Sequence, residues 1–187
     1  MSFKHLIIGC LALVVLGLAT CPVAHAQQAP PSEYQLKAAF LYNFAKFVEW
    51  PPEAFPDPAT PFTIGIIGQD PFSGDLERTV KAKTARGHPF AIKQIKSLSE
   101  LKTCQILFVC ASERKRLPDI LTALGDASVL TVSELERFMQ SGGMINFLME
   151  GHKVRFEIND AAARRVGLRI SSKLLSLAGR TAKEGEK

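Results

Sequence analysis

The sequence predicts a single α/β domain with a mainly parallel sheet, helices on both faces and a β-hairpin near the C-terminus. First, strand-like and helix-like segments alternate four times between residues 62 and 140. Second, the strand predicted over residues 105–110 is continuously apolar after Gln105, which is typical of a strand buried on both faces. Third, residues 144–149 and 153–159 flank a Gly-containing turn. No internal repeat or long linker divides the domain.

The first element is a helix predicted over residues 33–48, with Ser32 as a candidate cap. Pro51 and Pro52 end it, because a residue before proline avoids the helical region. Core packing is one interpretation of its apolar stripe, and contact with another protein is the second. The stripe contains Leu36, Ala39, Phe40, Phe44 and Phe47 and is widened by Leu41, Tyr42, Val48 and Trp50.

The alternating segments follow a proline-rich loop over residues 51–61. Ser112 caps one predicted helix and Gly125 ends it, while Ser133 and Glu136 form a capping box for another. The strands are predicted at residues 62–68, 89–95, 105–110 and 127–132, and the helices at residues 70–82, 97–101, 112–124 and 133–140.

The hairpin is the most specific local pattern. Residues 153–159 alternate strictly, so that Val154 and Phe156 share one face and Arg155 and Glu157 the other. Asn159 or Asp160 then caps a helix over residues 161–166, which Gly167 ends. Residues 168–170 are again extended, and Ser171 or Ser172 caps a final helix.

The N-terminus has the pattern of a cleaved signal peptide over residues 1–26. An apolar run precedes Ala24-His25-Ala26, so the mature chain is expected to begin at Gln27. A membrane anchor is disfavoured because the run is shorter than the ~20 residues of a span, and lipidation at Cys21 is a second alternative. We expect a flexible lead over residues 27–32, the domain over 33–180 and a disordered tail over 181–187.

The net charge of +5 does not indicate a nucleic-acid binder, because Lys and Arg are scattered along the chain. The densest basic run, Arg114 to Arg116, lies beside Glu113 and Asp119. Nucleic acid is therefore not an expected partner.

Two cysteines remain after the leader, Cys104 and Cys110, on either side of a predicted strand. Such a strand separates them by about 20 Å, whereas a disulfide needs Cα atoms about 4.4–6.8 Å apart. We therefore expect both thiols to be free within one chain.

The remaining motifs give little support for an active site, a metal or a cofactor. The glycines between Gly65 and Gly74 match neither a dinucleotide fingerprint nor a P-loop, and a tight strand-to-helix turn explains them. His88 and His152 have no clustered ligands and no nucleophile partner. We expect no catalytic, cofactor-binding or metal-binding residues and predict that the protein is not an enzyme.

Two separated motifs resemble the YfiR-like family of small bacterial periplasmic proteins. The resemblance covers about residues 33–178. The motifs are A-A-F-L-Y-N-F-A-K-F-V-E-W-P (38–51) near the N-terminus and, near the C-terminus, S-G-G-M-I-N-F (141–147), V-R-F-E-I-N (154–159), A-A (161–162) and G-L-R-I-S-S-K-L-L (167–175).

The resemblance implies a dimeric periplasmic regulator that docks on the extracytoplasmic part of a membrane signalling protein. The best-known arrangement represses a membrane diguanylate cyclase and keeps cyclic-di-GMP output low. Two other functions stay open: a small-ligand-binding accessory protein for a transporter or sensor kinase, and an enzyme of unknown type. Structural disulfides of some family members are not expected here, because this chain lacks the additional cysteines.

Two candidate surfaces follow from the residues. If the strands carrying them are neighbours, Arg155, Glu157 and Arg169 converge, and with Ser171 and Asn159 they form a candidate site for a small polar or anionic ligand. A cross-strand salt-bridge ladder is the alternative interpretation. Leu41, Tyr42 and Trp50 are the candidate partner or dimer surface, because Phe40, Phe44 and Phe47 can fill the core-facing stripe.

Overall fold

The computed structural model describes residues 30–181. The predicted signal peptide, the Cys21 alternative, most of the predicted lead and residues 182–187 lie outside this range. Within it, no helix is both long and apolar enough to cross a membrane. The helices are α2 (Glu33–Phe47), α3 (Asp75–Val80), α4 (Leu117–Leu124), α5 (Asp160–Arg165) and α6 (Ser172–Leu177), with short 3-10 helices η1 (Pro52–Ala54), η2 (Leu98–Thr103) and η3 (Ala111–Arg116).

The strands form the predicted, mainly parallel sheet. The main sheet has the order β10-β8-β7-β6-β5-β2-β4-β3, and a separate antiparallel pair joins β1 to β9. The bounds are β1 (Val48–Glu49), β2 (Phe62–Ile67), β3 (Thr84–Ala85), β4 (His88–Ile95), β5 (Ile106–Val109), β6 (Leu130–Ser133), β7 (Ile145–Glu150), β8 (Lys153–Ile158), β9 (Arg169–Ile170) and β10 (Arg180–Thr181).

The order in which successive strands are added to the sheet reverses at β2. The chain passes from β2 to β4 on one side and then to β5 on the other, and all three strands are parallel. A sheet of this kind has its topological switch point at the carboxyl ends of β2 and β5, where ligands often bind. A ligand site is therefore expected first at this position.

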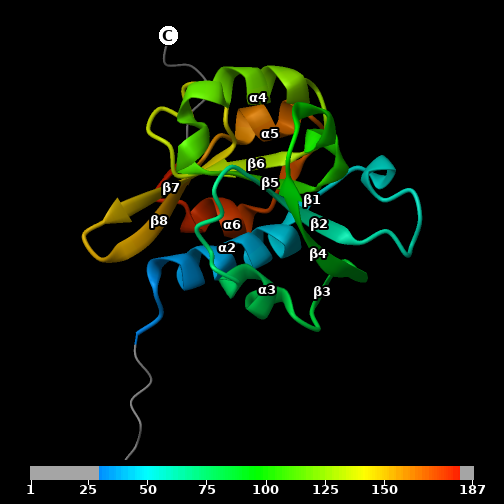
Figure 1. Ribbon diagram of the computed structural model, residues 1–187, viewed down its shortest axis with the longest axis horizontal. Helices are drawn as coiled ribbons and strands as arrows, with labels where there is room; N and C mark the ends of the chain where they lie inside the picture. The colour runs from blue at the N-terminus through cyan, green and yellow to red at the C-terminus, as the bar shows by residue number, and fades with distance from the viewer. Residues whose placement is uncertain (1–29, 182–187) are drawn as a thin grey trace, which may run out of the picture. The chain divides into compact units, whose positions relative to one another are not determined.

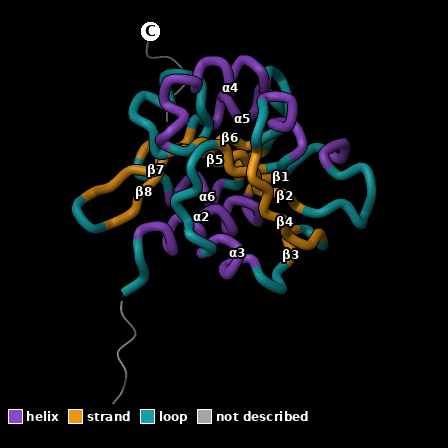
Figure 2. Tube along the Cα trace, viewed as in Figure 1, coloured by secondary structure: helices purple, strands orange, loops and turns teal. Residues whose placement is uncertain are grey.

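Helices cover both faces of the sheet, as predicted (Figures 1 and 2). One apolar cluster joins α2, α3 and α6 to the sheet around the buried Phe44, Phe62 and Phe108. A second cluster lies on the opposite face, where Ile120 and Leu124 of α4 pack on Leu107. The predicted hairpin is confirmed as the antiparallel pair of β7 and β8, with Phe147 opposite Phe156.

Two predicted helices are shorter than expected. Asp70 Oδ1 accepts a hydrogen bond from Phe72 N at 2.8 Å, and positive φ angles at Ser73 and Gly74 continue the turn, so α3 begins only at Asp75. The segment predicted as one helix over residues 112–124 is divided into η3 and α4.

The helix predicted over residues 133–140 is wrong. Ser133 Oγ donates to the Val109 carbonyl at 2.7 Å and accepts from Leu135 N at 3.2 Å. The chain then forms hydrogen-bonded turns, with Arg137 at φ 64° and the Phe138 side chain fully buried. Tertiary burial of Leu135 and Phe138 outweighs the local capping pattern here.

Candidate functional site

The switch point is filled by the protein's own side chains. Gly68 follows β2 with φ 99°, and a Cβ added there would lie 2.4 Å from Ser112 Oγ. The same hydroxyl accepts a hydrogen bond from Gln69 N at 2.9 Å. At Gly65, an added Cβ would lie 2.9 Å from Cys104 Sγ. The glycines therefore serve close packing and a tight turn, which agrees with the structural interpretation of this motif.

A buried charged cluster lies between α2 and the segment after β6. The Lys37 side chain is only 2% exposed, and its ammonium contacts the carboxylates of Glu33 and Glu134. Tyr34 donates its hydroxyl to Glu134 Oε1 at 3.1 Å, and Lys37 Nζ lies 4.6 Å from the centre of the Tyr34 ring. Burial and the nearby Glu134 charge raise the pKa of Tyr34 to about 12. The sequence interpretation missed this cluster, although a lysine within the apolar stripe of the first helix was a usable signal.

The two described cysteines are free and buried, as predicted. Burial raises the pKa of the Cys104 thiol to about 12. Burial also raises the pKa of Cys110 to about 12, with smaller contributions from Asp70, Glu134 and Glu113. Both thiols are therefore held in their unreactive, protonated form at neutral pH.

The polar face of β8 carries two of the predicted ligand residues. Arg155 Nε lies 3.5 Å from Glu150 Oε2, and both side chains are about half exposed or more. Glu157 Oε1 lies 3.5 Å from Asn146 Nδ2. These contacts are what the alternative interpretation, a cross-strand polar ladder, predicts.

The strand pairing that would bring Arg169 beside Arg155 and Glu157 does not form. It required the strand of Arg169 to neighbour β8, but β9 pairs with β1, placing Arg169 opposite Glu49. The strands beside β8 are β7 and β10. Ser171 caps α6 by accepting from Leu174 N at 3.3 Å, and Asn159 Oδ1 caps α5 by accepting from Ala162 N at 3.0 Å. A ligand role for Arg155 and Glu157 stays a prediction.

Two of the three side chains predicted to lie on the surface of the first motif are buried in the core. Leu41 is fully buried and Trp50 is 7% exposed, so neither faces outward. Trp50 Nε1 donates to the Gln105 carbonyl at 3.1 Å, and its ring contacts Phe62 edge-on. Tyr42 alone among the three predicted surface residues is half-buried, with Lys46 and Lys83 over its ring. An apolar stripe predicts which helix packs, but not how completely its flanks are covered.

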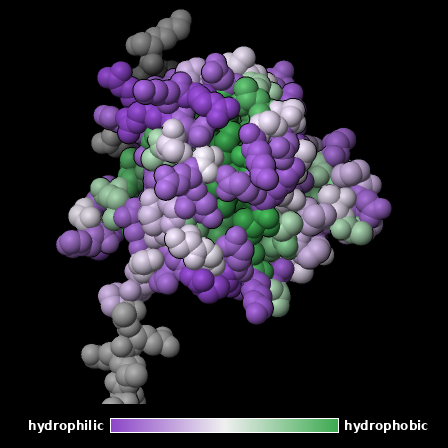
Figure 3. All heavy atoms as spheres, viewed as in Figure 1, coloured by the Kyte–Doolittle hydropathy of each residue, from purple (hydrophilic) through white to green (hydrophobic). Residues whose placement is uncertain are grey.

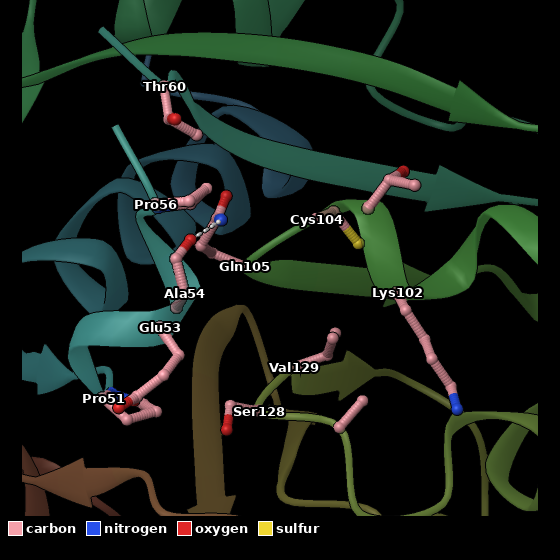
Figure 4. A pocket seen from close by; sticks show the side chains of 12 residues that line it. Pro51, Glu53, Ala54, Pro56, Thr60, Lys102, Cys104, Gln105, Ser128 and Val129 are labelled. Atoms are coloured by element: carbon pink, nitrogen blue, oxygen red, sulfur yellow. Dashed lines mark hydrogen bonds between the residues drawn. The ribbon is translucent and has the colours of Figure 1, made fainter. Parts of the chain in front are cut away.

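A pocket of about 440 Å³ lies at the amino ends of β2, β5 and β6, opposite the switch point (Figure 4). Gln105 forms part of its wall: Nε2 donates to the Ala54 carbonyl at 2.9 Å and Oε1 accepts from Thr63 N at 2.7 Å. Glu53 and Lys102 lie on opposite sides, with Val129 between them (Figure 4). The pocket thus offers one negative group, one positive group and an apolar surface in between.

Among residues 30–181, no group of three or more His, Cys, Asp or Glu side chains is placed to hold a metal ion.

The YfiR/HmsC-like family model matches residues 34–179, which is most of the chain. The chain belongs to this family. The YfiR/HmsC-like family consists of periplasmic regulatory proteins that interact with a membrane partner. A search of curated proteins finds no significant match.

The chain is similar in fold to a conserved domain protein from Vibrio cholerae, with a TM-score of 0.51 and 10% sequence identity. The match covers 82% of this chain and 61% of the Vibrio protein's length. A second similar structure is the ABC domain from Streptococcus pneumoniae in complex with L-Trp, with a TM-score of 0.46 and 12% identity over 64% of this chain and 56% of that one. At 10% identity the likeness to the Vibrio protein concerns the fold alone.

Proposed function

We propose that this chain is a periplasmic regulator, exported by a cleaved signal peptide, that docks on the extracytoplasmic domain of a membrane signalling protein and represses it. The expected partner is a membrane diguanylate cyclase, whose cyclic-di-GMP output docking keeps low. The observation that carries the proposal is the family match over residues 34–179. We also propose that the regulator is a homodimer.

Cross-linking in intact envelopes tests this function. The tagged chain is expected to form a cross-link with a membrane-spanning protein whose cytoplasmic part synthesises cyclic-di-GMP, identified by mass spectrometry of the linked peptides. An untagged chain and an unrelated tagged periplasmic protein control for background. Cross-links confined to periplasmic enzymes or outer-membrane proteins would contradict the proposal.

A second candidate function is binding of a small solute, favoured by the pocket between Glu53 and Lys102. Its opposite charges fit a small molecule that carries both an ammonium and a carboxylate group. Thermal melts of the purified chain with a panel of free amino acids test this, with Lys102→Gln and Lys115→Gln as the variant and its matched surface control. An amino acid that raises the melting temperature of the wild type and of Lys115→Gln, but not of Lys102→Gln, would support binding in the pocket. No change in melting temperature with any amino acid would contradict it.

A further inference from the structure

The edge of the main sheet at β4 is largely open. β4 pairs with β2 throughout Phe90–Ile95, but β3 covers its other side only at His88 and Pro89. Within residues 30–181, no strand lies along the outer side of Phe90–Ile95. Every second residue of this run therefore directs its backbone N–H and C=O outward, which is the template on which an extended peptide can add as a further strand.

An apolar groove of about 460 Å³ runs beside this edge, between α3 and β4. Phe90 and Ile92 are two residues apart on β4 and therefore face it together, opposite Val80 at the end of α3. Figure 3 shows a band of apolar side chains crossing this face of the molecule and reaching the region between α3 and β4. A strand added at the edge would place alternate side chains in this groove.

The rim of the groove carries positive charges without carboxylate partners. Lys81 and Lys83 line the groove and are exposed, as is the nearby Lys46, and among the described residues none of the three lies within 4.0 Å of a carboxylate. Lys46 and Lys83 instead flank the Tyr42 ring at 5.4 and 4.5 Å from its centre. Glu77 is the one acidic residue that lines the groove.

We propose that the β4 edge, the groove and this basic rim form a docking surface for an extended, acidic segment of a partner protein. Backbone pairing with Phe90–Ile95 supplies affinity, apolar side chains at alternate positions enter the groove, and acidic residues between or beside them neutralise the rim. A second copy of this chain fits less well, because pairing two such edges would bring the same cations together. The inference rests on the proposed function, since it assigns the surface through which the chain holds its partner.

A defined peptide tests the surface on the purified chain. The probe is a fluorescein-labelled heptapeptide that alternates glutamate with valine or phenylalanine, and binding is followed by fluorescence polarisation. We expect saturable binding that weakens with added salt. The double variant Lys81→Glu/Lys83→Glu should weaken it roughly tenfold or more. Lys115→Glu makes the same type of charge change in η3 and should leave it unchanged, with thermal melts showing that all variants fold.

Backbone methylation distinguishes strand addition from side-chain docking. Two peptides are methylated at alternate amide nitrogens, so that one set blocks the nitrogens facing β4 and the other set blocks those facing solvent. We expect one peptide to lose binding at least about tenfold and the other to keep it. Equal effects of the two sets would overturn the pairing, and no binding of the unmethylated peptide would overturn the docking surface.

A membrane surface and a second copy of this chain are the alternative occupants of the β4 edge, and each predicts a different experimental result. Lysine-dependent binding to phosphatidylglycerol vesicles, without peptide binding, would assign the rim to a membrane surface and overturn the proposal. A dimer that dissociates in Lys81→Glu/Lys83→Glu, and that the peptide does not disrupt, would assign the edge to a second copy. Because the peptide assay uses the purified chain alone, it can succeed even if the proposed repression of a cyclase fails.

Discussion

Lys37 is the side chain whose surroundings are least expected from its residue type. It lies buried on α2 with Glu33 and Glu134 as its carboxylate partners, and Tyr34 is part of the same cluster. Removing one member of a buried ion pair is costly, because the remaining charge keeps its desolvation penalty without its partner. The cluster therefore connects the start of α2 to the segment that follows β6.

We predict that Lys37→Met lowers the free energy of unfolding by roughly 3 kcal/mol, because Glu134 is left partly buried without a cation. The double variant Lys37→Met/Glu134→Gln should recover part of this loss, since it removes both charges. Urea unfolding of the two variants and of Glu134→Gln completes the cycle. A single variant within about 0.5 kcal/mol of the wild type would show that the cluster is not stabilising.

The buried thiols give a prediction for reactivity. At pH 8 a thiol reagent should modify neither Cys104 nor Cys110 in the folded protein and both after unfolding, because burial hides the thiols and raises their pKa to about 12. Mass spectrometry of the peptides that contain them measures this site by site. A disulfide between the two, or rapid modification of either in the folded state, would contradict the structure.

The same shift predicts weaker stability at alkaline pH. In the unfolded chain a cysteine has a pKa of about 8.5, whereas the folded pKa of Cys104 is about 12. The unfolded state therefore releases its proton first as the pH rises, and the stabilisation, fully present below about pH 8.5, is lost progressively towards pH 12. Urea midpoints measured from pH 8 to 11 should fall more steeply for the wild type than for Cys104→Ala, and equal slopes would contradict this.

At the scale of the elements, the bounds of α2 could be predicted from the sequence pattern, but the surroundings of its side chains could not. The helix and its end before Pro51-Pro52 were predictable, because periodicity and proline act locally. The burial of Trp50 was not, because it depends on Gln105 and Phe62, which are distant in sequence. The same reason explains the missed pairing of β9 with β1, which separated Arg169 from Arg155.

We predict opposite effects for the two aromatic residues of this region. Trp50→Ala should lower the free energy of unfolding by about 3–5 kcal/mol, because it removes a buried ring and the hydrogen bond to Gln105. Tyr42→Ala should cost much less, because Tyr42 lies half-buried at the basic rim, and it should weaken binding of the acidic peptide. Chemical denaturation and fluorescence polarisation measure the two effects. The reverse ranking in both assays would mean that Trp50, not Tyr42, faces the partner.

At the scale of the whole molecule, the alternation of strands and helices predicted the parallel sheet and its two covered faces. The strand order and the open edge at β4 could not be predicted from the sequence. Its exposure depends on β3 ending after two residues and on the remaining strands adding beyond β5. The candidate docking surface is thus a property of topology, whereas the packed glycines at the switch point were visible in the sequence.

The proposed repression of a membrane protein that produces cyclic-di-GMP can be measured in cells. The most direct measurement is the cellular cyclic-di-GMP level, by mass spectrometry, in a strain that lacks this chain and in strains complemented with the wild type, Lys81→Glu/Lys83→Glu or the Lys115→Glu control. We expect the level to rise on deletion and to return to normal with the wild type and Lys115→Glu, while the double variant, exported in equal amount, fails to restore it. A level that does not change on deletion, under conditions in which the chain is present in the periplasm of the parent strain, would contradict the claim.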